Sequence, residues 1–93
     1  VVDANVYYDG RVTSRELVTA DGVRKTLGVI LPGEYEFETE DEEAIEIRRG
    51  TVVVTLPGED PTTVGPGETV VVPPGTTFTV ETEDVVDYCC TYR

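Results

Sequence analysis

Three glutamates are the residues of this sequence whose types and spacing most readily indicate chemistry. Glu36 and Glu38 alternate within one short segment, and Glu43 follows shortly after them. Carboxylates brought together could hold a divalent cation through oxygen atoms alone, although transition-metal sites usually add imidazole ligands. The chain contains no histidine, and glutamates that alternate along a strand more often form a solvated face. We therefore predict no metal site and no metal cofactor.

The two cysteines, Cys89 and Cys90, are adjacent in the sequence. Neighbouring residues of a strand point to opposite faces, so these thiols cannot form a disulfide without an unusual turn. A disulfide framework is therefore excluded. We interpret at least one of them as a buried structural thiol in a reducing cytoplasm, with a reactive or metal-binding thiol pair as the alternative.

Acidic residues dominate the charge of the chain, with 19 Asp and Glu against 7 Lys and Arg and a net charge of −12. Nucleic acids and anionic membranes are bound through basic surfaces, so both are excluded as partners. No apolar run reaches the roughly 18 residues of a membrane span. This composition is typical of a salt-adapted or GC-rich source and equally of a redesigned sequence. Because the sequence begins at Val1 rather than Met, we expect that a short leader has been trimmed or left out.

Short runs of β-branched residues, separated by turn residues, must position these side chains. Asp9-Gly10 and Asp21-Gly22 are typical hairpin dipeptides, and Pro32-Gly33 and Pro57-Gly58 mark further turns. About nine strands in so short a chain predict one all-β domain over residues 1–93, folded as a closed barrel or a double-sheet jelly roll. The predicted strands are residues 5–8, 11–19, 24–31, 34–39, 44–48, 51–56, 68–72, 76–81 and 85–92.

One segment has the residue spacing of the second conserved motif of cupins. Gly67 is followed after five residues by Pro73-Pro74-Gly75, in which glycine supplies the backbone angle of a tight turn. The positions at which cupins carry a His and an Asn hold Phe78 and Thr82 here. The segment from Glu43 to Gly50 has the spacing that ends the first cupin motif. The resemblance implies a single-domain cupin-type jelly-roll barrel without the imidazoles that usually hold its metal.

Three segments narrow this resemblance to one family. They are Asn5 to Arg15, Arg24 to Phe37 and Asp87 to Tyr92. Their combination resembles the small pyrimidine/purine nucleoside phosphorylase family, over nearly the whole chain. The chain departs from the usual pattern of that family at Ile45, at Arg49 and in the loop 59–66, which has no Trp. These departures are expected to affect substrate fit more than fold.

The resemblance implies a metal-independent, cytoplasmic homodimer with broad specificity. Such an enzyme cleaves purine and pyrimidine nucleosides with phosphate as co-substrate, giving free base and ribose 1-phosphate. The transition state resembles an oxocarbenium ion, so a bound anion beside C1′ and a stabilised departing base matter most. The alternatives are a non-catalytic cupin module that binds small molecules, a redesigned scaffold and a cupin with a carboxylate-bound metal.

Under this resemblance, phosphate binding is assigned to cationic and hydroxyl side chains of the matched segments. Arg24 and Thr26 share one face of a predicted strand and Lys25 points to the other, so either the pair or Lys25 reaches the site. Ser14 is a second choice for phosphate, as is Arg11. Arg24 is also a candidate catalytic residue, and its alternative role is that of an ordinary surface charge.

The nucleobase needs an aromatic face on which to stack. Tyr35 and Phe37 share a face, Phe78 stands at a metal-ligand position of the barrel, and Tyr88 lies in the C-terminal segment. These four are the predicted nucleoside-binding residues, and a purely structural place in the core is the alternative for each of them.

A carboxylate is expected to bind the ribose hydroxyls or to protonate the departing base. Glu34 is the candidate catalytic acid because it lies in the Pro-Gly-Glu-Tyr segment, and Asp87 is the second choice. A carboxylic acid that donates near neutral pH needs its pKa raised by burial.

Overall fold

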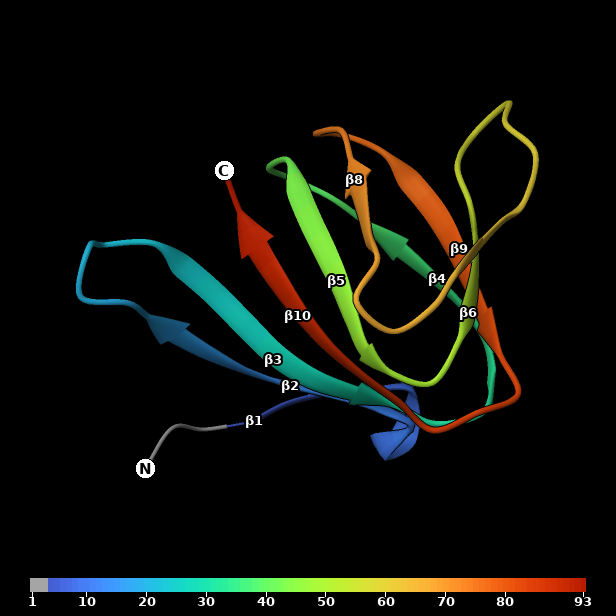
Figure 1. Ribbon diagram of the computed structural model, residues 1–93, viewed down its shortest axis with the longest axis horizontal. Coiled ribbons are helices and arrows are strands. Elements are labelled where there is room, and N and C mark those ends of the chain that lie inside the picture. Colours follow the sequence, from blue (N-terminus) through green and yellow to red (C-terminus); the bar gives the residue numbers. More distant parts are fainter. Residues whose placement is uncertain (1–3) are drawn as a thin grey trace.

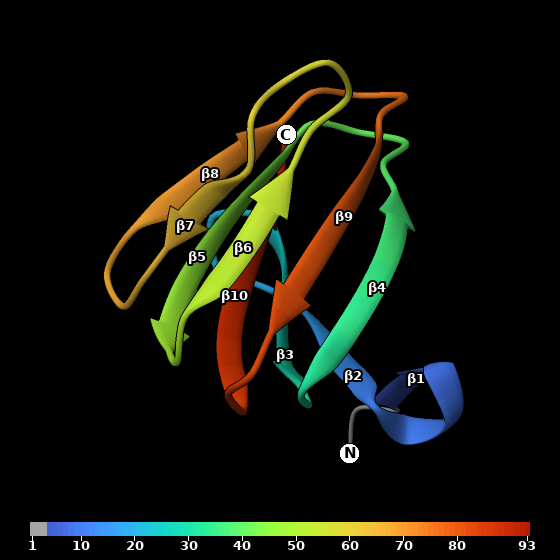
Figure 2. The same cartoon turned by 90° about the vertical axis from the view of Figure 1, so that its right-hand side faces the viewer.

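Two antiparallel sheets face each other in the computed structural model, which describes residues 4–93 (Figures 1 and 2). The first sheet has six strands in the order β1-β2-β3-β10-β5-β8, and the second has four in the order β4-β9-β6-β7. The strands are β1 (Ala4–Tyr7), β2 (Val12–Val18), β3 (Arg24–Ile30), β4 (Gly33–Glu38), β5 (Glu43–Arg49), β6 (Val52–Thr55), β7 (Thr62–Val64), β8 (Thr69–Val72), β9 (Thr77–Thr82) and β10 (Val86–Tyr92).

From β3 onward the chain passes repeatedly from one sheet to the other. Strands β3, β5, β8 and β10 lie in the six-stranded sheet, and β4, β6, β7 and β9 lie in the four-stranded sheet. Figure 2 shows the two layers with an open edge, so the sheets are not closed into a ring. The predicted all-β jelly roll is confirmed, as an open sandwich. Within residues 4–93 no helix is long and apolar enough to cross a membrane.

Nine of the ten strands correspond to predicted ones, and β7 was missed. The segment 59–66 contains Pro61, Gly65 and Pro66, which are typical of a loop. Residues Thr62–Val64 nevertheless pair with β6, with Val64 opposite Val52. The strand is short and lies at the edge of its sheet, where a neighbouring proline removes no interior hydrogen bond.

The core lies between the sheets because apolar and polar residues alternate along the strands. In β9, Phe78, Val80 and Thr82 are buried while the residues between them are more exposed. Phe78, at the position of the cupin histidine, is only 3% exposed. Burying such a side chain stabilises the fold by about 1.5–3 kcal/mol. Thr82, at the asparagine position, donates to the carbonyl oxygen of Thr51 at 2.8 Å.

A buried threonine anchors the turn of the cupin motif. The Thr39 hydroxyl donates to the carbonyl oxygen of Pro73 at 2.6 Å and accepts from the Thr76 N–H at 3.0 Å. Gly75 adopts a φ of 65°, which glycine tolerates without strain, and its N–H donates to the Thr39 carbonyl at 2.9 Å. The turn between β8 and β9 is thereby tied to the end of β4.

Candidate functional site

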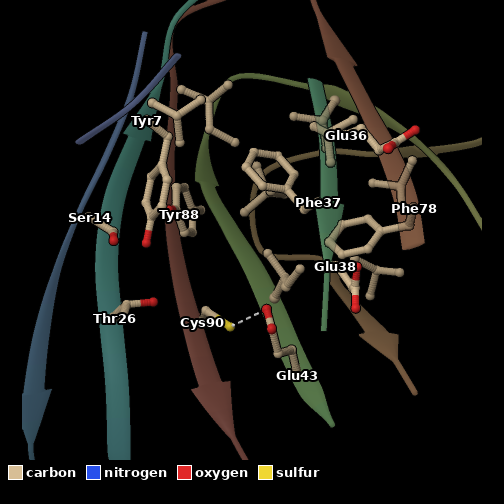
Figure 3. Close-up of a pocket in the computed structure, with 18 of the residues that line it drawn as sticks. Tyr7, Ser14, Thr26, Glu36, Phe37, Glu38, Glu43, Phe78, Tyr88 and Cys90 are labelled. Carbon is tan, nitrogen blue, oxygen red and sulfur yellow. Dashed lines mark hydrogen bonds between the residues drawn. The ribbon is translucent and has the colours of Figure 1, made fainter. Parts of the chain in front are cut away.

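A cavity of about 550 Å³ lies between the two sheets, and we call it the apolar chamber (Figure 3). Apolar side chains from both sheets make up most of its wall. Among them, the rings of Phe37 and Phe78 lie 5.9 Å apart, centroid to centroid. The other apolar residues of the wall are Val12, Ile30, Ile45, Ile47, Val52, Val54, Val70 and Val80.

A second cavity of about 220 Å³, the polar chamber, adjoins the first. The two share several lining residues: Tyr7, Ser14, Thr26, Glu38, Glu43 and Tyr92. Among the described residues that line the polar chamber, five are carboxylates and one, Arg24, is cationic. The five carboxylates are Glu16, Glu38, Glu40, Asp41 and Glu43. The combined site is therefore apolar on one side and polar, with an acidic excess, on the other.

Arg24, at the start of β3, is held by two neighbours in the polar chamber. Its guanidinium carbon lies 4.3 Å from the centroid of the Tyr92 ring, within the range of a cation–π contact. Its Nη2 donates to Asp41 Oδ2 at 3.1 Å. Thr26, two residues along the same strand, has its hydroxyl 3.2 Å from that of Tyr92. A guanidinium and two hydroxyls thus lie together beside the junction of the chambers.

Glu43 and Cys90 form a hydrogen-bonded pair on neighbouring strands of the cavity wall (Figure 3). The Cys90 thiol donates to Glu43 Oε1, with Sγ and Oε1 3.2 Å apart. Burial raises the pKa of the Glu43 carboxyl, and the hydrogen bond from Cys90 opposes that rise. Burial, and then the Glu43 carboxylate, raise the pKa of the Cys90 thiol. This thiol is therefore protonated at neutral pH, which disfavours the alternative of a reactive thiolate.

Tyr88 lines the apolar chamber and packs on a glycine of β3. A Cβ built on Gly28 would lie 2.4 Å from Tyr88 Cζ and 2.5 Å from the carbonyl oxygen of Thr13. Gly28 therefore provides the space in which the phenol ring sits. Burial raises the pKa of Tyr88 to about 12, so its hydroxyl stays neutral and able to donate.

Most of the residues predicted for the site line these chambers. The structure brings together Ser14, Thr26, Phe37, Phe78 and Tyr88 in the apolar chamber, and Arg24 with Ser14 and Thr26 in the polar chamber. Arg24 and Thr26 share the cavity side of β3, so the pair, rather than Lys25, is the alternative that reaches the cavity.

Three first-choice residues do not line either chamber: Lys25, Glu34 and Tyr35; the second choices Arg11 and Asp87 do not line them either. Lys25 points to the outer face of its strand, because β3 alternates. Glu34 is exposed on β4, opposite Glu81. Tyr35 is buried in the core, where its hydroxyl donates to the carbonyl oxygen of Leu31 at 2.8 Å. The geometry therefore gives Tyr35 a structural contact and leaves Glu34 in solvent.

The sequence predicted Cys90 only as a structural thiol or as part of a reactive or metal-binding pair, and it indicated Glu43 only as a metal ligand, so their contact in the cavity was not predicted. The signals were present, because Tyr88, Cys90 and Tyr92 share a face at the period of a strand. Glu43 stands at the glutamate position of the first cupin motif. What was missing was the pairing of β5 with β10, which places Glu43 opposite Tyr92.

The metal of typical cupins does not fit this cavity. The described residues contain no group of three His, Cys, Asp or Glu side chains placed to hold a metal ion. Phe78 stands at one metal-ligand position and has no atom that can coordinate a metal. The Glu43 carboxylate accepts a hydrogen bond from the Cys90 thiol. No step of the chemistry proposed below therefore runs through a metal.

Of the positions at which the chain departs from the family pattern, Ile45 lies in the cavity wall. Arg49 is exposed, and the segment 59–66 does not line either chamber. The shape of the apolar chamber is thus affected at one point of its wall.

Comparisons with known proteins agree with the fold and with the resemblance. A variant of Bacillus subtilis oxalate decarboxylase has a TM-score of 0.79 at 14% identity, over 98% of this chain and 27% of that one, so it shows the cupin-type fold alone. A protein of unknown function from Acinetobacter sp. ADP1 has a TM-score of 0.95 at 34% identity, over 100% of this chain and 91% of that one.

Sequence comparison gives the family. A pyrimidine/purine nucleoside phosphorylase of Hydrogenovibrio crunogenus is 51% identical over 90 residues, which cover 96% of this chain and 86% of that protein. The sequence profile of the pyrimidine/purine nucleoside phosphorylases matches residues 2–92. The chain therefore belongs to the pyrimidine/purine nucleoside phosphorylase family.

Proposed function

We propose that this chain catalyses the phosphorolysis of purine and pyrimidine nucleosides to free base and ribose 1-phosphate, without a metal ion. One observation supports this beyond family membership. The apolar chamber shares six lining residues with a polar chamber that is also lined by Arg24. A nucleoside has a similar division, because a flat aromatic base that stacks through its faces is joined to a polar sugar at C1′, the atom that phosphate attacks.

The apolar chamber is the proposed site of the nucleobase. Its volume of about 550 Å³ lies within the range of small-molecule sites, roughly 300–1,000 Å³. Phe37 and Phe78 offer aromatic faces for stacking. Because aliphatic and aromatic side chains dominate its wall, the chamber would select bases by shape and stacking more than by hydrogen bonds to their edges. Such selection admits both purines and pyrimidines, which favours broad specificity.

The polar chamber is the proposed site of phosphate. The Arg24 guanidinium supplies the positive charge, and the hydroxyls of Thr26 and Ser14 supply further hydrogen bonds. Stacking on Tyr92 orients the guanidinium. The ribose would then lie at the junction, with C1′ between the two chambers and phosphate placed for attack.

The acidic excess of the polar chamber favours a second candidate function, a module that binds nucleosides without cleaving them. Five carboxylates around one arginine oppose the binding of a phosphate dianion. A non-catalytic module would bind nucleosides with an affinity that is independent of phosphate.

The two functions are separated by incubating the purified protein with inosine or uridine, with and without phosphate, in the presence of a chelator. Phosphorolysis predicts base release that requires phosphate and survives chelation. In Arg24→Ala the KM for phosphate should rise more than the KM for nucleoside. Arg48→Ala is the matched control, because Arg48 is exposed, lines neither chamber and pairs with Glu46 at 3.5 Å. A folded protein that releases no base in phosphate would refute the proposal.

We also propose that the protein works as a homodimer in the cytoplasm. The exposed apolar side chains Leu27, Val29 and Val71 on the six-stranded sheet support an interface between copies. The free thiols of Cys89 and Cys90 suit a reducing compartment. Light scattering coupled to size exclusion tests the dimer, and a monomeric mass would contradict it.

A further inference from the structure

The chemistry at the junction of the chambers requires a proton as well as an anion. When the bond between C1′ and the base nitrogen breaks, the bonding electrons leave with the base. A purine or pyrimidine anion is a poor leaving group, so a positioned acid that protonates it accelerates the reaction by about 10²–10⁴-fold. The acid must lie at the junction of the apolar and polar chambers, beside the bond between the base and the sugar.

Glu43 lies at that place. It lines both chambers, at the first residue of β5, and Figure 3 shows its carboxyl among the labelled cavity residues beside Cys90. One of its oxygens, Oε1, accepts from the Cys90 thiol, which fixes the carboxyl group. Oε2 makes no hydrogen bond with the described residues and is available to a ligand.

The surroundings of Glu43 favour the protonated acid. On β8 its partner in register is the buried Val72, and burial raises its pKa. Arg24, on β3, opposes this rise and Asp41 adds to it. Further titratable groups line the two chambers around it: Tyr88, Cys90 and Tyr92 on β10, Glu36 and Glu38 on β4, Glu16 on β2, Tyr7 on β1, and Tyr8 and Glu40 between strands.

We propose that Glu43, held by the Cys90 thiol, is the acid that protonates the departing nucleobase. The proposal rests on the proposed function. In the balanced step, a phosphate oxygen forms the new bond to C1′ as the C1′–N bond breaks. The Glu43 proton passes to the base, and the proton that hydrogen phosphate loses restores Glu43 through solvent. Glu34, which is exposed and outside the cavity, has no part in this step.

The leaving group separates acid catalysis from other roles of Glu43. A natural nucleoside needs a proton on its base, whereas the nitrophenolate of 4-nitrophenyl β-D-riboside departs without one. In Glu43→Gln we expect kcat/KM for inosine and uridine to fall at least about 100-fold and that for the activated riboside to fall less than about tenfold. Glu46→Gln is the matched control, because Glu46 lies on the same strand outside both chambers.

The thiol gives a second readout. Activity with natural nucleosides should decline as pH rises through the pKa of Glu43. Cys90→Ala removes a hydrogen bond that stabilises the carboxylate, so the decline should move to higher pH. Cys90→Ser substitutes a stronger donor and should move it to lower pH.

Each outcome decides between the proposals. Equal losses for inosine and the activated riboside in Glu43→Gln, with a native circular dichroism spectrum, would assign Glu43 to sugar binding and overturn the acid. A pH profile that both Cys90 variants leave unchanged would also overturn it. If the wild type cleaves neither substrate in phosphate, the proposed function fails, and the acid fails with it.

Discussion

Replacing Asp41 by Asn should strengthen phosphate binding at the proposed site, because Asp41 would compete with phosphate for Arg24. The two side chains are 3.1 Å apart at Nη2 and Oδ2, and they are 44% and 56% exposed. A bound phosphate must take the place of that carboxylate at the guanidinium. Asp41→Asn removes the competitor and also one negative charge from an acidic chamber.

The exposure of the pair determines the magnitude. Exposed ion pairs are worth about 0.2–1 kcal/mol, which corresponds to a factor of about 1.4 to 5 in an equilibrium constant. The KM for phosphate should therefore fall by about 1.4- to 5-fold, and reduced repulsion acts in the same direction. The difference should shrink as salt is added, because screening weakens both contributions.

The assay is initial-rate phosphorolysis of inosine across a range of phosphate concentrations, for wild type and Asp41→Asn at low and high salt. Glu42→Gln is the matched control. It makes the same change in net charge one residue away, where Glu42 pairs with Arg93 at 3.5 Å and does not line either chamber. An unchanged or raised phosphate KM in Asp41→Asn, or an equal fall in Glu42→Gln, would refute the reasoning.

The remaining predictions concern stability. Gly28→Ala would place its Cβ 2.4 Å from Tyr88 Cζ, and such overpacking costs about 1–3 kcal/mol of folding stability. The Tm in thermal unfolding should fall by about 4–8 °C for each kcal/mol lost, and an unchanged Tm would contradict the packing. Thr39→Val leaves the Thr76 N–H and the Pro73 carbonyl without their hydrogen bonds to Oγ1. The free energy of unfolding, measured by urea denaturation, should fall by about 1–3 kcal/mol, and a loss below about 0.5 kcal/mol would contradict the role of Thr39 in the turn. The pKa of Glu43 is raised above its ordinary value of 4.5, so the ionised carboxylate costs folding stability at pH values above the folded-state pKa. This cost disappears as the pH falls towards 4.5. Glu43→Gln should therefore raise the Tm at pH 7 with a gain that vanishes below pH 4.5, and a gain that is constant with pH would contradict the burial of a charge.

Local patterns in the sequence were sufficient to predict most of the strands and to predict which residues share a face of a strand. Alternation along β3 grouped Arg24 with Thr26 and separated both from Lys25, and the structure places the first two in the cavity. The same alternation limited the prediction on β4. Glu34 and Tyr35 are neighbours on opposite faces of β4, one exposed and one buried in the core, and neither lines the cavity.

Contacts between distant segments account for what the sequence could not predict. Tyr35 is packed by Tyr8, with ring centroids 5.1 Å apart, and a local pattern does not show that contact. Cys90 meets Glu43 because β10 pairs with β5, and the two residues are 47 positions apart. The register of such a pair depends on the whole sheet, and a shift by one residue would turn Cys90 away from the cavity.

The central claim is that the two chambers bind a nucleoside and phosphate together and exchange the base for phosphate. Phosphorus NMR of the protein with inosine and phosphate tests it most directly, because it observes the new bond between phosphate and the sugar. The account predicts a sugar 1-phosphate resonance that grows in step with free hypoxanthine and is strongly reduced in Arg24→Ala. Base release without a sugar phosphate, or no reaction of the folded protein, would contradict it.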